Sequence, residues 1–411
     1  MPQSDLLPLE QAIDKIKLYF NTISSEDVFL QDALGRCLAE PVISKLDNPK
    51  YNVSSMDGYA INYQKFINNN GLTQLKIIGE SAAGNPFKGK INNNETVRIF
   101  TGAKIPDGCD TVIIQEDVNI SPDKKYISTS VEIVKHQHVR IKGLDLKENQ
   151  KIFSKGTIVT SRHLGSIAMT GQAWLTVTRK PVISILSTGN EISKVGELFH
   201  NDQIPSGNNL MIAGMIKGFG GLPRILPIAS DKVSEIYKTL KNALDSDLIV
   251  TTGGVSVGKY DLIQKALLKF KENNKIEFWK IAMRPGKPLL FSKIFNTPLI
   301  GLPGNPVSSG VCCMLFVNLA IRKMLGVKGD YPVYERAILE GKLNNNDQRL
   351  DFVRAKLSYK ENVSYVKPIK KQDSSMITEF SLSNCLIVRP PYDISRVSGE
   401  FVTIFKYPNN I

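Results

Sequence analysis

The sequence predicts a multidomain protein of α/β and β class, with a mostly parallel sheet at its centre. At 411 residues it is longer than one hydrophobic core usually supports, so about two to four domains are expected. Residues 181–326 alternate strand-like apolar runs with helical patterns, which is typical of a parallel sheet with helices on both faces. Residues 46–143 and 331–411 contain short runs separated by turn residues, which favours β structure.

Local periodicity predicts the elements that precede residue 181. "LPLEQAIDKIKLYF" (7–20) has apolar residues at helical spacing, and "SRHLGSIAMTGQ" (161–172) is a shorter helical pattern. Between them, "LKIIGE", "TVRIFTG" and "DTVIIQEDV" predict short strands. "WLTVTRKPVISILSTG" (174–189) then predicts two strands that Pro181 interrupts.

Regular strand–helix alternation begins at Pro181. The predicted strands are "VISIL", "PRILPIA", "DLIVTTGG", "IEFWKIAM", "PLLFSKIF" and "PLIGLPGNP". The predicted helices are "NNLMIAGMIKGFG", "KVSEIYKTLKNAL", "YDLIQKALLKF" and one after the last strand. Ligands of such sheets bind at the carboxyl ends of the strands, so the loops that follow the strands are the candidate site.

The charge balance favours acidic partners. Lys and Arg number 52 against 39 Asp and Glu, a net charge of +13. A phosphorylated small molecule and a nucleic acid would both fit this excess. The sequence has no RNA-binding signature and no long basic run, so we expect no nucleic-acid partner.

Cysteine usage and the N-terminus predict a location. The five cysteines form no C-x-x-C pair, which disfavours a disulfide framework or a zinc site and favours a reducing compartment. The N-terminus has no apolar segment typical of a signal peptide, and the longest apolar run, "VCCMLFV", is too short to cross a membrane. We therefore expect a cytoplasmic protein with no membrane partner.

Small and polar residues follow three predicted strands of the α/β region. Glycines let the backbone approach a ligand closely, short hydroxyls donate hydrogen bonds, and a following helix N-terminus favours an anion. For any one loop alone, an ordinary strand-to-helix turn is the favoured explanation, but three in one α/β unit favour a shared phosphate site. They comprise Ser187, Thr188 and Gly189, then Gly253, Gly254 and Ser256, and then Pro303, Gly304 and Pro306.

Three cations surround the Pro-Gly turn of "FWKIAMRPGKP". Lys280, Arg284 and Lys287 cannot all lie along one regular exposed face. Next to glycine-rich anion loops they suit an oxyanion or a polyphosphate. The alternative is a solvated basic turn.

Carboxylates accompany these loops. Glu191 follows the first loop, Asp231 follows "LPIAS", and Asp261 ends "TTGGVSVGKYD". Asp57 in "SSMDGYA" and Asp145 in "RIKGLDL" lie in the β-rich part. Taken singly, each is explained as a helix cap or a turn residue. Taken together beside phosphates, they favour a divalent cation between the charges, and Mg²⁺ is the usual one.

Seven segments, in order along the chain, resemble the molybdopterin molybdenumtransferases, a family of molybdenum cofactor synthesis related to the E domain of gephyrin. They are "SSMDGYA", "RIFTGAKIPDGCDTVI", "RIKGLD", "ILSTGNE", "TTGGVSVGKYD", "FWKIAMRPGKP" and "GLPGNPVS". The resemblance covers nearly the whole chain and implies an elongated homodimer of four-domain subunits. It implies residues 1–44 with 147–180 as a helical spine and dimerisation domain, 45–146 as an inserted β domain, 181–326 as the molybdopterin-binding α/β domain, and 327–411 as a C-terminal β-barrel.

The resemblance implies a transferase reaction in which molybdate enters the dithiolene of adenylylated molybdopterin. Mg²⁺-dependent cleavage of the phosphoanhydride then releases AMP. Glycine loops would hold the phosphates, cations would hold molybdate, and acids would hold the metal, with Glu191 and Asp261 as the expected ligands. A molybdopterin adenylyltransferase is the expected partner protein.

The resemblance also implies roles for single residues. Its acidic or hydroxyl positions match Asp57, Thr101, Asp145, Glu191, Asp231 and Asp261, its cationic positions match Lys280, Arg284 and Lys287, its rigid loop matches Pro303 and Pro306, and the last domain contributes Arg354 and Ser375. Because the inserted domain of one subunit faces the α/β domain of the other in this family, Asp57 and Asp145 would act in trans.

Four sites depart from the family pattern, one of them in the last domain, where "SNC" (383–385) replaces a more usual Ala-Asn-Gly. The other three are single residues. Asn190 replaces a usual Asp, Lys259 replaces a common Glu, and Arg284 replaces a frequent Lys. Arginine and lysine differ in the geometry with which they bind an oxyanion.

Two other functions remain open at this point. A molybdopterin adenylyltransferase would use a similar α/β domain, but it usually consists of that domain alone and would lack "SSMDGYA". A non-catalytic scaffold is the second alternative, although the acidic residues would then have no task.

Overall fold

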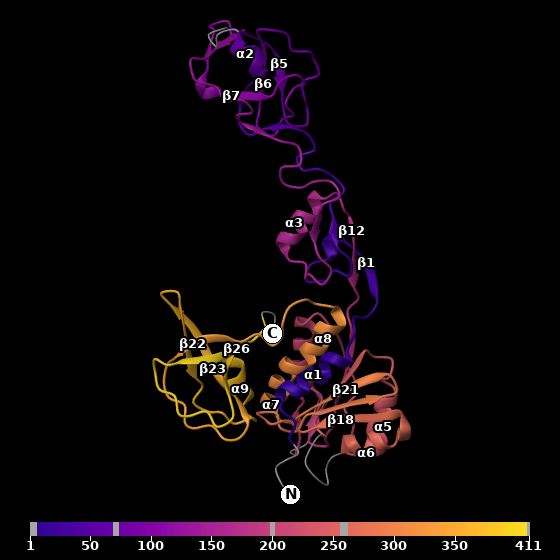
Figure 1. Cartoon of the computed structure of the whole chain (residues 1–411). Helices are drawn as coiled ribbons and strands as arrows, with labels where there is room; N and C mark the ends of the chain where they lie inside the picture. Colours follow the sequence, from indigo (N-terminus) through magenta and orange to yellow (C-terminus); the bar gives the residue numbers. More distant parts are fainter. Residues whose placement is uncertain (1–5, 69–73, 198–201, 255–261, 409–411) are drawn as a thin grey trace.

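The computed structural model describes residues 6–68, 74–197, 202–254 and 262–408. The molecule is elongated (Figure 1). A β-rich region forms one end, a narrow segment leads away from it, and an α/β domain with a β-barrel beside it forms the other end. This arrangement confirms the predicted fold class of α/β and β parts.

A six-stranded sheet forms the centre of the α/β domain. Its strand order is β16-β13-β17-β21-β20-β18, and the bonds between the first four strands are parallel. The last two strands run antiparallel to their neighbours, so the sheet is mixed at one edge. The strands are β13 (Val182–Ser187), β16 (Leu222–Ile225), β17 (Leu248–Thr252), β18 (Asn274–Trp279), β20 (Leu290–Ile294) and β21 (Thr297–Leu302).

Helices cover both faces of this sheet because its strands are apolar on both sides. On one face, Ile183 and Ile185 of β13 pack in the largest hydrophobic core. Leu186 points to the other face and packs in a second core. The first core contains α4 (Gly207–Gly218), α7 (Pro306–Cys312) and α8 (Asn318–Leu325), and the second contains α5 (Val233–Lys241) and α6 (Leu262–Leu268).

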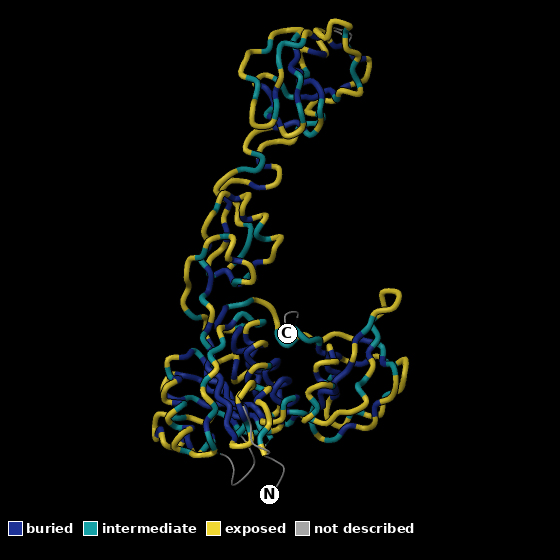
Figure 2. The backbone as a smooth tube through the Cα atoms, turned by 180° about the vertical axis from the view of Figure 1, so that it is seen from behind, coloured by how far each residue is buried: buried dark blue, intermediate teal, exposed yellow. Residues whose placement is uncertain are grey.

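A continuous helical stretch joins α7 to α8 through a π-helical turn, Cys313–Val317. Among the described residues, Pro306–Leu325 is the one helix long and apolar enough to cross a membrane, and 89% of its most apolar window is buried inside the protein. Its apolar side chains belong to the largest core. Figure 2 colours buried residues dark blue along the backbone, and they concentrate in the α/β domain.

The first helix packs in the α/β domain and not in the spine that was expected to include residues 1–44. Helix α1 (Leu9–Tyr19) places Leu9, Ala12, Ile13 and Ile16 in the same core as α8. The amide of Leu7 donates to the carbonyl of Lys280 at 3.2 Å. The spacing i, i+3, i+4, i+7 makes one apolar stripe, and the large core of the α/β domain is able to bury it.

The narrow segment in the middle of the molecule is built mainly from paired strands. β1 (Ser25–Phe29) pairs with β12 (Trp174–Thr178), and β2 (Val42–Ile43) pairs with β11 (Lys151–Phe153). Helix α3 (Ser161–Met169) packs beside them around a small core of its own. A helical spine was expected for this segment. The structure has the helix α3 there, and the remaining regular structure consists of the two strand pairs.

The distal β region holds a second six-stranded sheet with the order β7-β4-β6-β5-β9-β8. It comprises β4 (Gly58–Ile61), β5 (Leu75–Ser81), β6 (Glu95–Ile99), β7 (Thr111–Ile114), β8 (Asn119–Ile120), β9 (Tyr126–Ser128) and the helix α2 (Tyr63–Asn68). A two-stranded ribbon, β3 (Val53–Ser54) with β10 (Val139–Arg140), lies at its base.

The C-terminal strands close into a barrel. Five strands pair in the ring β23-β24-β22-β26-β25, and β25 returns to β23. They are β22 (Glu335–Leu339), β23 (Leu350–Lys360), β24 (Val363–Pro368), β25 (Cys385–Arg389) and β26 (Phe401–Lys406), with α9 (Ile377–Leu382) between β24 and β25. The short strand β19 (Met283–Arg284) of the α/β domain pairs with β23 and so joins the barrel to that domain.

Candidate functional site

The loops after β13, β17 and β21 meet at one edge of the central sheet. These three strands are adjacent and parallel, so their carboxyl ends lie together. A Cβ added to Gly253 would lie 2.7 Å from the Thr188 carbonyl oxygen, and one added to Gly304 would lie 3.7 Å from the Cα of Gly253. At φ +85°, Gly253 also has a backbone conformation that favours glycine. The structure therefore brings together the loops that the sequence predicted to form one site.

Asn208, in the first turn of α4, holds two of these loops together. Its Nδ2 donates to the Gly304 carbonyl oxygen at 2.7 Å and lies 3.4 Å from Thr252 Oγ1. This residue was not among those predicted from the sequence. Its position at the start of a helix that follows a predicted strand was the available signal.

Buried hydroxyl groups without partners lie at the end of β13. Ser187 and Thr188 are 2% and 3% exposed, and neither side-chain oxygen has a hydrogen-bond partner among the described residues. Buried polar groups in proteins are normally paired. Unpaired buried hydroxyls at a strand exit mark this loop as a candidate binding position.

Glu191 folds over the loop that follows β13. A Cβ at Gly189 would lie 2.6 Å from the Glu191 carboxyl carbon, so the glycine leaves room for this carboxylate. Asn190 and Asp231 exchange two hydrogen bonds, from each backbone amide to the other's side-chain oxygen, at 3.2 and 3.1 Å. Asp231 thus fixes the first loop, and the unusual Asn190 supplies the acceptor for the Asp231 amide.

The oxygen donors at this edge match the chemistry of Mg²⁺, which prefers one or two carboxylates with phosphate and hydroxyl oxygens. Glu191 offers an exposed carboxylate in the loop that follows Ser187 and Thr188. The described residues contain no group of three or more His, Cys, Asp or Glu able to hold a metal alone. The other expected ligand, Asp261, and the expected phosphate-binding Ser256 lie outside the described residues.

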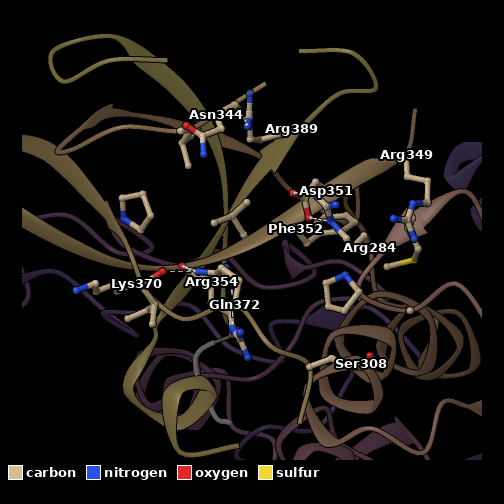
Figure 3. Close-up of a pocket in the computed structure, with 18 of the residues that line it drawn as sticks. Arg284, Ser308, Asn344, Arg349, Asp351, Phe352, Arg354, Lys370, Gln372 and Arg389 are labelled. Atoms are coloured by element: carbon tan, nitrogen blue, oxygen red, sulfur yellow. Dashed lines mark hydrogen bonds and ion pairs between the residues drawn. The ribbon is translucent and has the colours of Figure 1, made fainter. Parts of the chain in front are cut away.

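A cationic cavity of about 880 Å³ lies between the α/β domain and the barrel (Figure 3). The turn around Gly286 and the loop after β21 line it from one side, through Lys287, Asn305 and Ser308. Barrel residues line the other side, among them Arg349, Arg354, Lys367, Lys370, Gln372, Ser374 and Arg389. Basic side chains outnumber the acidic ones, Glu340 and Asp351, in this lining.

Most arginines of the cavity are engaged within the protein. Arg284 contacts Asp351 with its Nε at 3.1 Å and its Nη2 at 2.5 Å, and its Nη1 lies 3.1 Å from Asp347. The hydrogen bonds to Asp351 raise the pKa of the Arg284 guanidinium. Hydrogen bonds from Arg349 hold the pKa of Asp347 below its usual value. Arg284 therefore fixes the barrel to the α/β domain.

The lysines provide the unpaired charge. Within the described parts of the chain, no ion pair or side-chain hydrogen bond involves Lys287, Lys367 or Lys370, all of which line the cavity. An oxyanion in the cavity would meet these ammonium groups first. Lys287 was predicted from the sequence but the two barrel lysines were not, because a single lysine on a short strand or in the loop after it gives no periodic signal.

Lys280 lies at the same edge of the sheet but not in the lining of the cationic cavity. It follows β18, and its Nζ is 4.1 Å from the centroid of the Trp279 ring. Of the three cations in the predicted cluster, Lys280 therefore makes a cation–π contact, Arg284 forms ion pairs, and Lys287 lines the cavity.

Arg354 is buried, at 1% exposure, and its guanidinium serves the chain itself. It donates to the carbonyl oxygens of Asp373 and Lys371 at 2.9 and 3.1 Å, and burial lowers its pKa. It thereby shapes the segment that carries Ser374 and Ser375. The Ser374 side chain meets Asn305 of the third loop at 2.8 Å, whereas the exposed Ser375 bonds to Asp373 at 2.6 Å.

Three expected site residues lie far from this edge within one chain. Asp57 accepts a hydrogen bond from the Thr101 amide at 2.8 Å in the distal β region. Asp145 accepts one from Asn48 at 3.0 Å, where that region joins the narrow segment. The length of the molecule separates Asp57 and Thr101 from the central sheet (Figure 1).

Comparisons with known proteins agree with this architecture. Family models describe residues 7–171 as the MoeA N-terminal region (domain I and II), 184–323 as a probable molybdopterin binding domain, and 336–407 as the MoeA C-terminal region (domain IV). A molybdopterin molybdenumtransferase of Haemophilus influenzae is 35% identical over 405 residues, covering 97% of this chain and 98% of its own. The chain belongs to the molybdopterin molybdenumtransferase family.

Further members of the family support the same conclusion. A molybdopterin molybdenumtransferase from Nostoc is 29% identical, with coverage of 99% of this chain and 96% of its own. The crystal structure of the molybdopterin biosynthesis MoeA protein from Pyrococcus horikoshii superposes with a TM-score of 0.83 at 26% identity, covering 98% of this chain and 100% of that one. Membership of the molybdopterin molybdenumtransferase family makes the chain an enzyme of the transferase class with a role in molybdenum cofactor biosynthesis.

Proposed function

We propose that this transferase inserts molybdate into adenylylated molybdopterin and releases AMP in a Mg²⁺-dependent reaction. One observation carries the proposal. Three glycine-containing strand exits converge around Thr188, next to a cavity of about 880 Å³ whose unpaired charges are lysines. A phosphoanhydride and a tetrahedral oxyanion both need such surroundings, and they need them side by side.

The phosphates of the substrate are assigned to the exits of β13 and β17. Backbone amides at glycines allow close approach, and the hydroxyls of Ser187 and Thr188 are buried and available. In the proposed complex these hydroxyls donate to phosphate oxygens. Asn208 keeps the Gly304 loop in place against this site.

Molybdate is assigned to the cationic cavity. Lys287 from the α/β domain and Lys367 and Lys370 from the barrel offer ammonium groups, and Ser308 offers a hydroxyl from the start of α7. An oxyanion held there lies next to the third loop, on the side of the sheet where the dithiolene sulfurs of the substrate would bind. These side chains concentrate and orient molybdate, and no protein nucleophile takes part.

Glu191, together with Asp261, is the proposed ligand set for Mg²⁺. When bound, Mg²⁺ would neutralise phosphate charge and polarise the anhydride. Glu191 is exposed and lies against Gly189, and the Asn190–Asp231 pair fixes this loop. Residues of the chain thus position the carboxylate before the metal arrives.

The functional unit is proposed to be a homodimer. Asp57 and Thr101 cannot reach the central sheet of their own chain, but a second copy could bring them to it. The narrow segment exposes several large apolar side chains, which suits a contact surface. They are Phe29 (39%), Leu34 (59%), Ile158 (41%), Met169 (49%) and Trp174 (62%).

The wider setting is also proposed. A cytoplasmic location and a molybdopterin adenylyltransferase partner, which would supply the adenylylated substrate, both fit the reaction. The cysteines agree with a reducing compartment, since all five described thiols are free.

The test is a reconstitution of the reaction with purified protein, adenylylated molybdopterin, molybdate and Mg²⁺, in which AMP is measured. Wild-type protein should release AMP in a molybdate-dependent manner. Glu191→Gln and Asp261→Ala should both abolish this release, whereas Glu272→Gln, at an exposed position in the 3-10 turn Lys271–Asn273, should retain it. Full turnover by Asp261→Ala would refute the metal assignment.

The same assay separates the alternatives. A molybdopterin adenylyltransferase would consume ATP and unmodified molybdopterin and would release no AMP in response to molybdate. A scaffold would do neither. Neither alternative explains why the chain matches its relatives over 97% of its length, distal β region and barrel included.

A further inference from the structure

Trp279 and Lys280 lie at the end of β18, at the same edge of the sheet as the three loops of the candidate site. β18 and β21 both run antiparallel to β20, so β18 ends at the edge where β21 ends. At this edge the register forms one row across the sheet, from Thr251 through Gly301 and Leu290 to Trp279. Lys280 follows this row directly, so it lies level with the strand exits.

The Trp279 ring packs on the face of the sheet that α5 and α6 cover, against the second hydrophobic core. Its Nε1 is buried, and no hydrogen-bond partner for it occurs in the described parts of the chain. Buried tryptophan N–H groups usually find a partner. Apolar packing therefore holds this ring, and its contact with a charged group is made through its face.

The backbone at Lys280 explains how that contact arises. Its φ is +81°, in the left-handed region that residues other than glycine rarely adopt. In an extended strand, two consecutive side chains point to opposite faces of the sheet. The left-handed residue breaks this alternation, and the Lys280 Nζ lies 4.1 Å from the centroid of the neighbouring Trp279 ring. Within the described residues this is the shortest cation–π distance.

Hydrogen bonds hold the backbone of Lys280 from both sides. Its amide donates to the Leu289 carbonyl oxygen at 3.0 Å, and its carbonyl oxygen accepts from the Leu7 amide at 3.2 Å. The amide of Ile281 donates to the Lys287 carbonyl oxygen at 2.9 Å. Strained backbone conformations persist where the surrounding structure enforces them, and they cluster at functional sites. The conformation of Lys280 therefore points to a task for its side chain.

The Lys280 ammonium has no counter-charge among the residues that the structure describes, whereas Lys275 of the same strand pairs with Glu277 at 2.7 Å. Lys280 is also half-buried, so water reaches it less than it reaches a surface lysine. An aromatic face attracts an ammonium group but supplies no negative charge to neutralise it. The charge and its donors thus stay available to an anion at the strand exits.

We infer that Trp279 is a positioning residue that holds the Lys280 ammonium at the strand-exit edge for a tetrahedral oxyanion. The inference rests on the proposed function, in which that oxyanion is a phosphate of the substrate or molybdate. A lysine side chain loses much conformational freedom when it binds a ligand. On the ring, Lys280 has lost that freedom before the anion arrives, so binding costs less. Trp279 touches no substrate and takes no part in the chemical step.

The first test uses the fluorescence of Trp279. The chain has two tryptophans, so Trp174→Phe leaves Trp279 as the sole source of tryptophan emission. The full-length variant is titrated with molybdate in one arm and with inorganic pyrophosphate in the other. An oxyanion that meets the ammonium changes the electric field at the ring, so the emission should change and saturate in at least one arm. The arm that responds identifies the oxyanion.

Two lysine variants in this background show whether the signal depends on Lys280. Lys280→Met should reduce the amplitude at least about fivefold, because it removes the ammonium but keeps an unbranched side chain. Lys269→Met is the matched control. Lys269 is exposed, and its Nζ lies 6.0 Å from the centroid of the Tyr237 ring. Its loss should leave the emission change as it is.

The second test measures the affinity for the responding oxyanion by calorimetry. Trp279→Leu should weaken binding about fivefold, because the ammonium loses its support. Trp279→Phe keeps an aromatic face and should bind within about twofold of the wild type. In a Lys280→Met background, adding Trp279→Leu should cause no further loss, since the ring acts through the ammonium.

Tyr237→Leu is the control for a merely structural effect. Tyr237 packs against the same core as Trp279 and also has a lysine over its ring. This variant should bind the oxyanion as the wild type does. Circular dichroism should show the same secondary structure in every variant.

Three results would overturn the inference. They are an unchanged emission in both arms, an affinity in Trp279→Leu that is unchanged or tighter, and an equal loss from Trp279→Leu with and without the Lys280 ammonium. The proposed function fails separately. If the binding pattern holds but wild-type protein releases no AMP from the adenylylated substrate, the role of Trp279 stands and the reaction is wrong.

Discussion

At Gly253 the backbone of one strand exit passes directly over the next. Its φ is +85°, and a Cβ at this position would lie 2.7 Å from the Thr188 carbonyl oxygen, so any side chain would push the two loops apart. Gly108 has a similar φ of +91°, but a Cβ there would meet nothing within 4 Å. The two glycines therefore share the left-handed backbone conformation, but only Gly253 contacts a second loop. Comparing alanine variants at the two positions separates the effect of the conformation from the effect of the contact.

Gly253→Ala is expected to lower molybdate-dependent AMP release by about a hundredfold, because small displacements of binding groups are costly to catalysis. Gly108→Ala should retain wild-type turnover. Each variant should lose about 1–2 kcal/mol of unfolding free energy from the left-handed backbone. Gly253→Ala should lose more than Gly108→Ala, because its Cβ also meets the Thr188 carbonyl oxygen. Initial rates and denaturant unfolding measure the two effects, and equal turnover in the two variants would contradict the role given to the Gly253 contact.

Arg354 has a structural task, because its guanidinium holds a loop of the barrel in place. Its charge is buried, and the acceptors are backbone carbonyls of residues 371 and 373 together with the Gln372 side chain, which lies 3.4 Å from Nε. These bonds hold the loop that brings Ser374 to Asn305.

Arg354→Met is expected to lower the free energy of unfolding by roughly 3 kcal/mol, because it removes the hydrogen bonds that a buried charged group donates to residues 371–373. Arg336→Met, at an exposed barrel position over the Phe401 ring, should change it by less than about 0.5 kcal/mol. Urea unfolding of the full-length proteins measures both. If Arg354→Met were as stable as the control, the structural role of the guanidinium would be wrong.

At the scale of elements, ion pairs fix the connection between β25 and β26. Asp393 is 9% exposed and lies between Arg389 and Arg396, with contacts of 3.0 and 2.6 Å. Burial raises the pKa of the Asp393 carboxyl, whereas hydrogen bonds and charge interactions with Arg396 and Arg389 lower it. Together these interactions outweigh burial, so the pKa lies below the ordinary 3.8.

The depressed pKa predicts a pH-dependent contribution to stability. Asp393 stabilises the fold fully above its unfolded pKa near 3.8, and this stabilisation is lost as the pH falls through the lower folded value. Asp393→Asn should therefore be less stable than wild type at pH 7 by roughly 3 kcal/mol, since it leaves two arginines without a counter-charge. The difference should narrow as the pH falls below about 4.

Denaturant midpoints measured at a series of pH values from neutral to acid check this expectation. Asp330→Asn, at an exposed position before the barrel, serves as the control and should follow the wild type throughout. A stability difference for Asp393→Asn that stays constant with pH would show that the ion pairs do not produce it.

At the scale of the whole molecule, the distance between the distal β region and the central sheet determines how the site can be assembled. Asp57 is bonded to the Thr101 amide at one end of the chain, and Glu191 lies at the other. If both serve one reaction, they must come from different subunits.

Mixed dimers test this requirement. Asp57→Ala and Glu191→Gln homodimers should each be inactive in AMP release. Co-expression of the two should restore about a quarter of wild-type activity, because about half of randomly mixed dimers are heterodimers and each carries one intact site. No recovery in isolated heterodimers would show that the site does not combine residues from two subunits.

Much of the α/β domain could be predicted from sequence because its signals are local. The strand runs, the helical spacing of "KVSEIYKTLKNAL" and the glycines after "DLIVTT" each lie within a few residues of one another, and they correspond to α5, β17 and the loop after it. The same holds for the strand exits, since parallel strands place their carboxyl ends together. Their meeting at Thr188, Gly253 and Gly304 follows from that rule.

The contacts between distant segments could not be predicted in this way. The apolar stripe of α1 shows that it must be buried, but not that α8 and the central sheet bury it. Likewise, "FWKIAMRPGKP" shows three cations without showing that Arg284 pairs with Asp351, which is 67 residues away in sequence. Each of these depends on which surface the rest of the chain leaves available.

The sequence by itself determined the fold class, the strand exits that form the candidate site, and the resemblance that the family matches bear out, because all three are encoded in short segments. The tertiary structure decided which charges are free. It pairs Arg284 and buries Arg354, leaves the lysines of the cavity without partners among the described residues, and places the Lys280 ammonium over the Trp279 ring. The physical reason is that a side chain's charge is fixed by its type, whereas its partners and its exposure to water are set only when remote segments pack together.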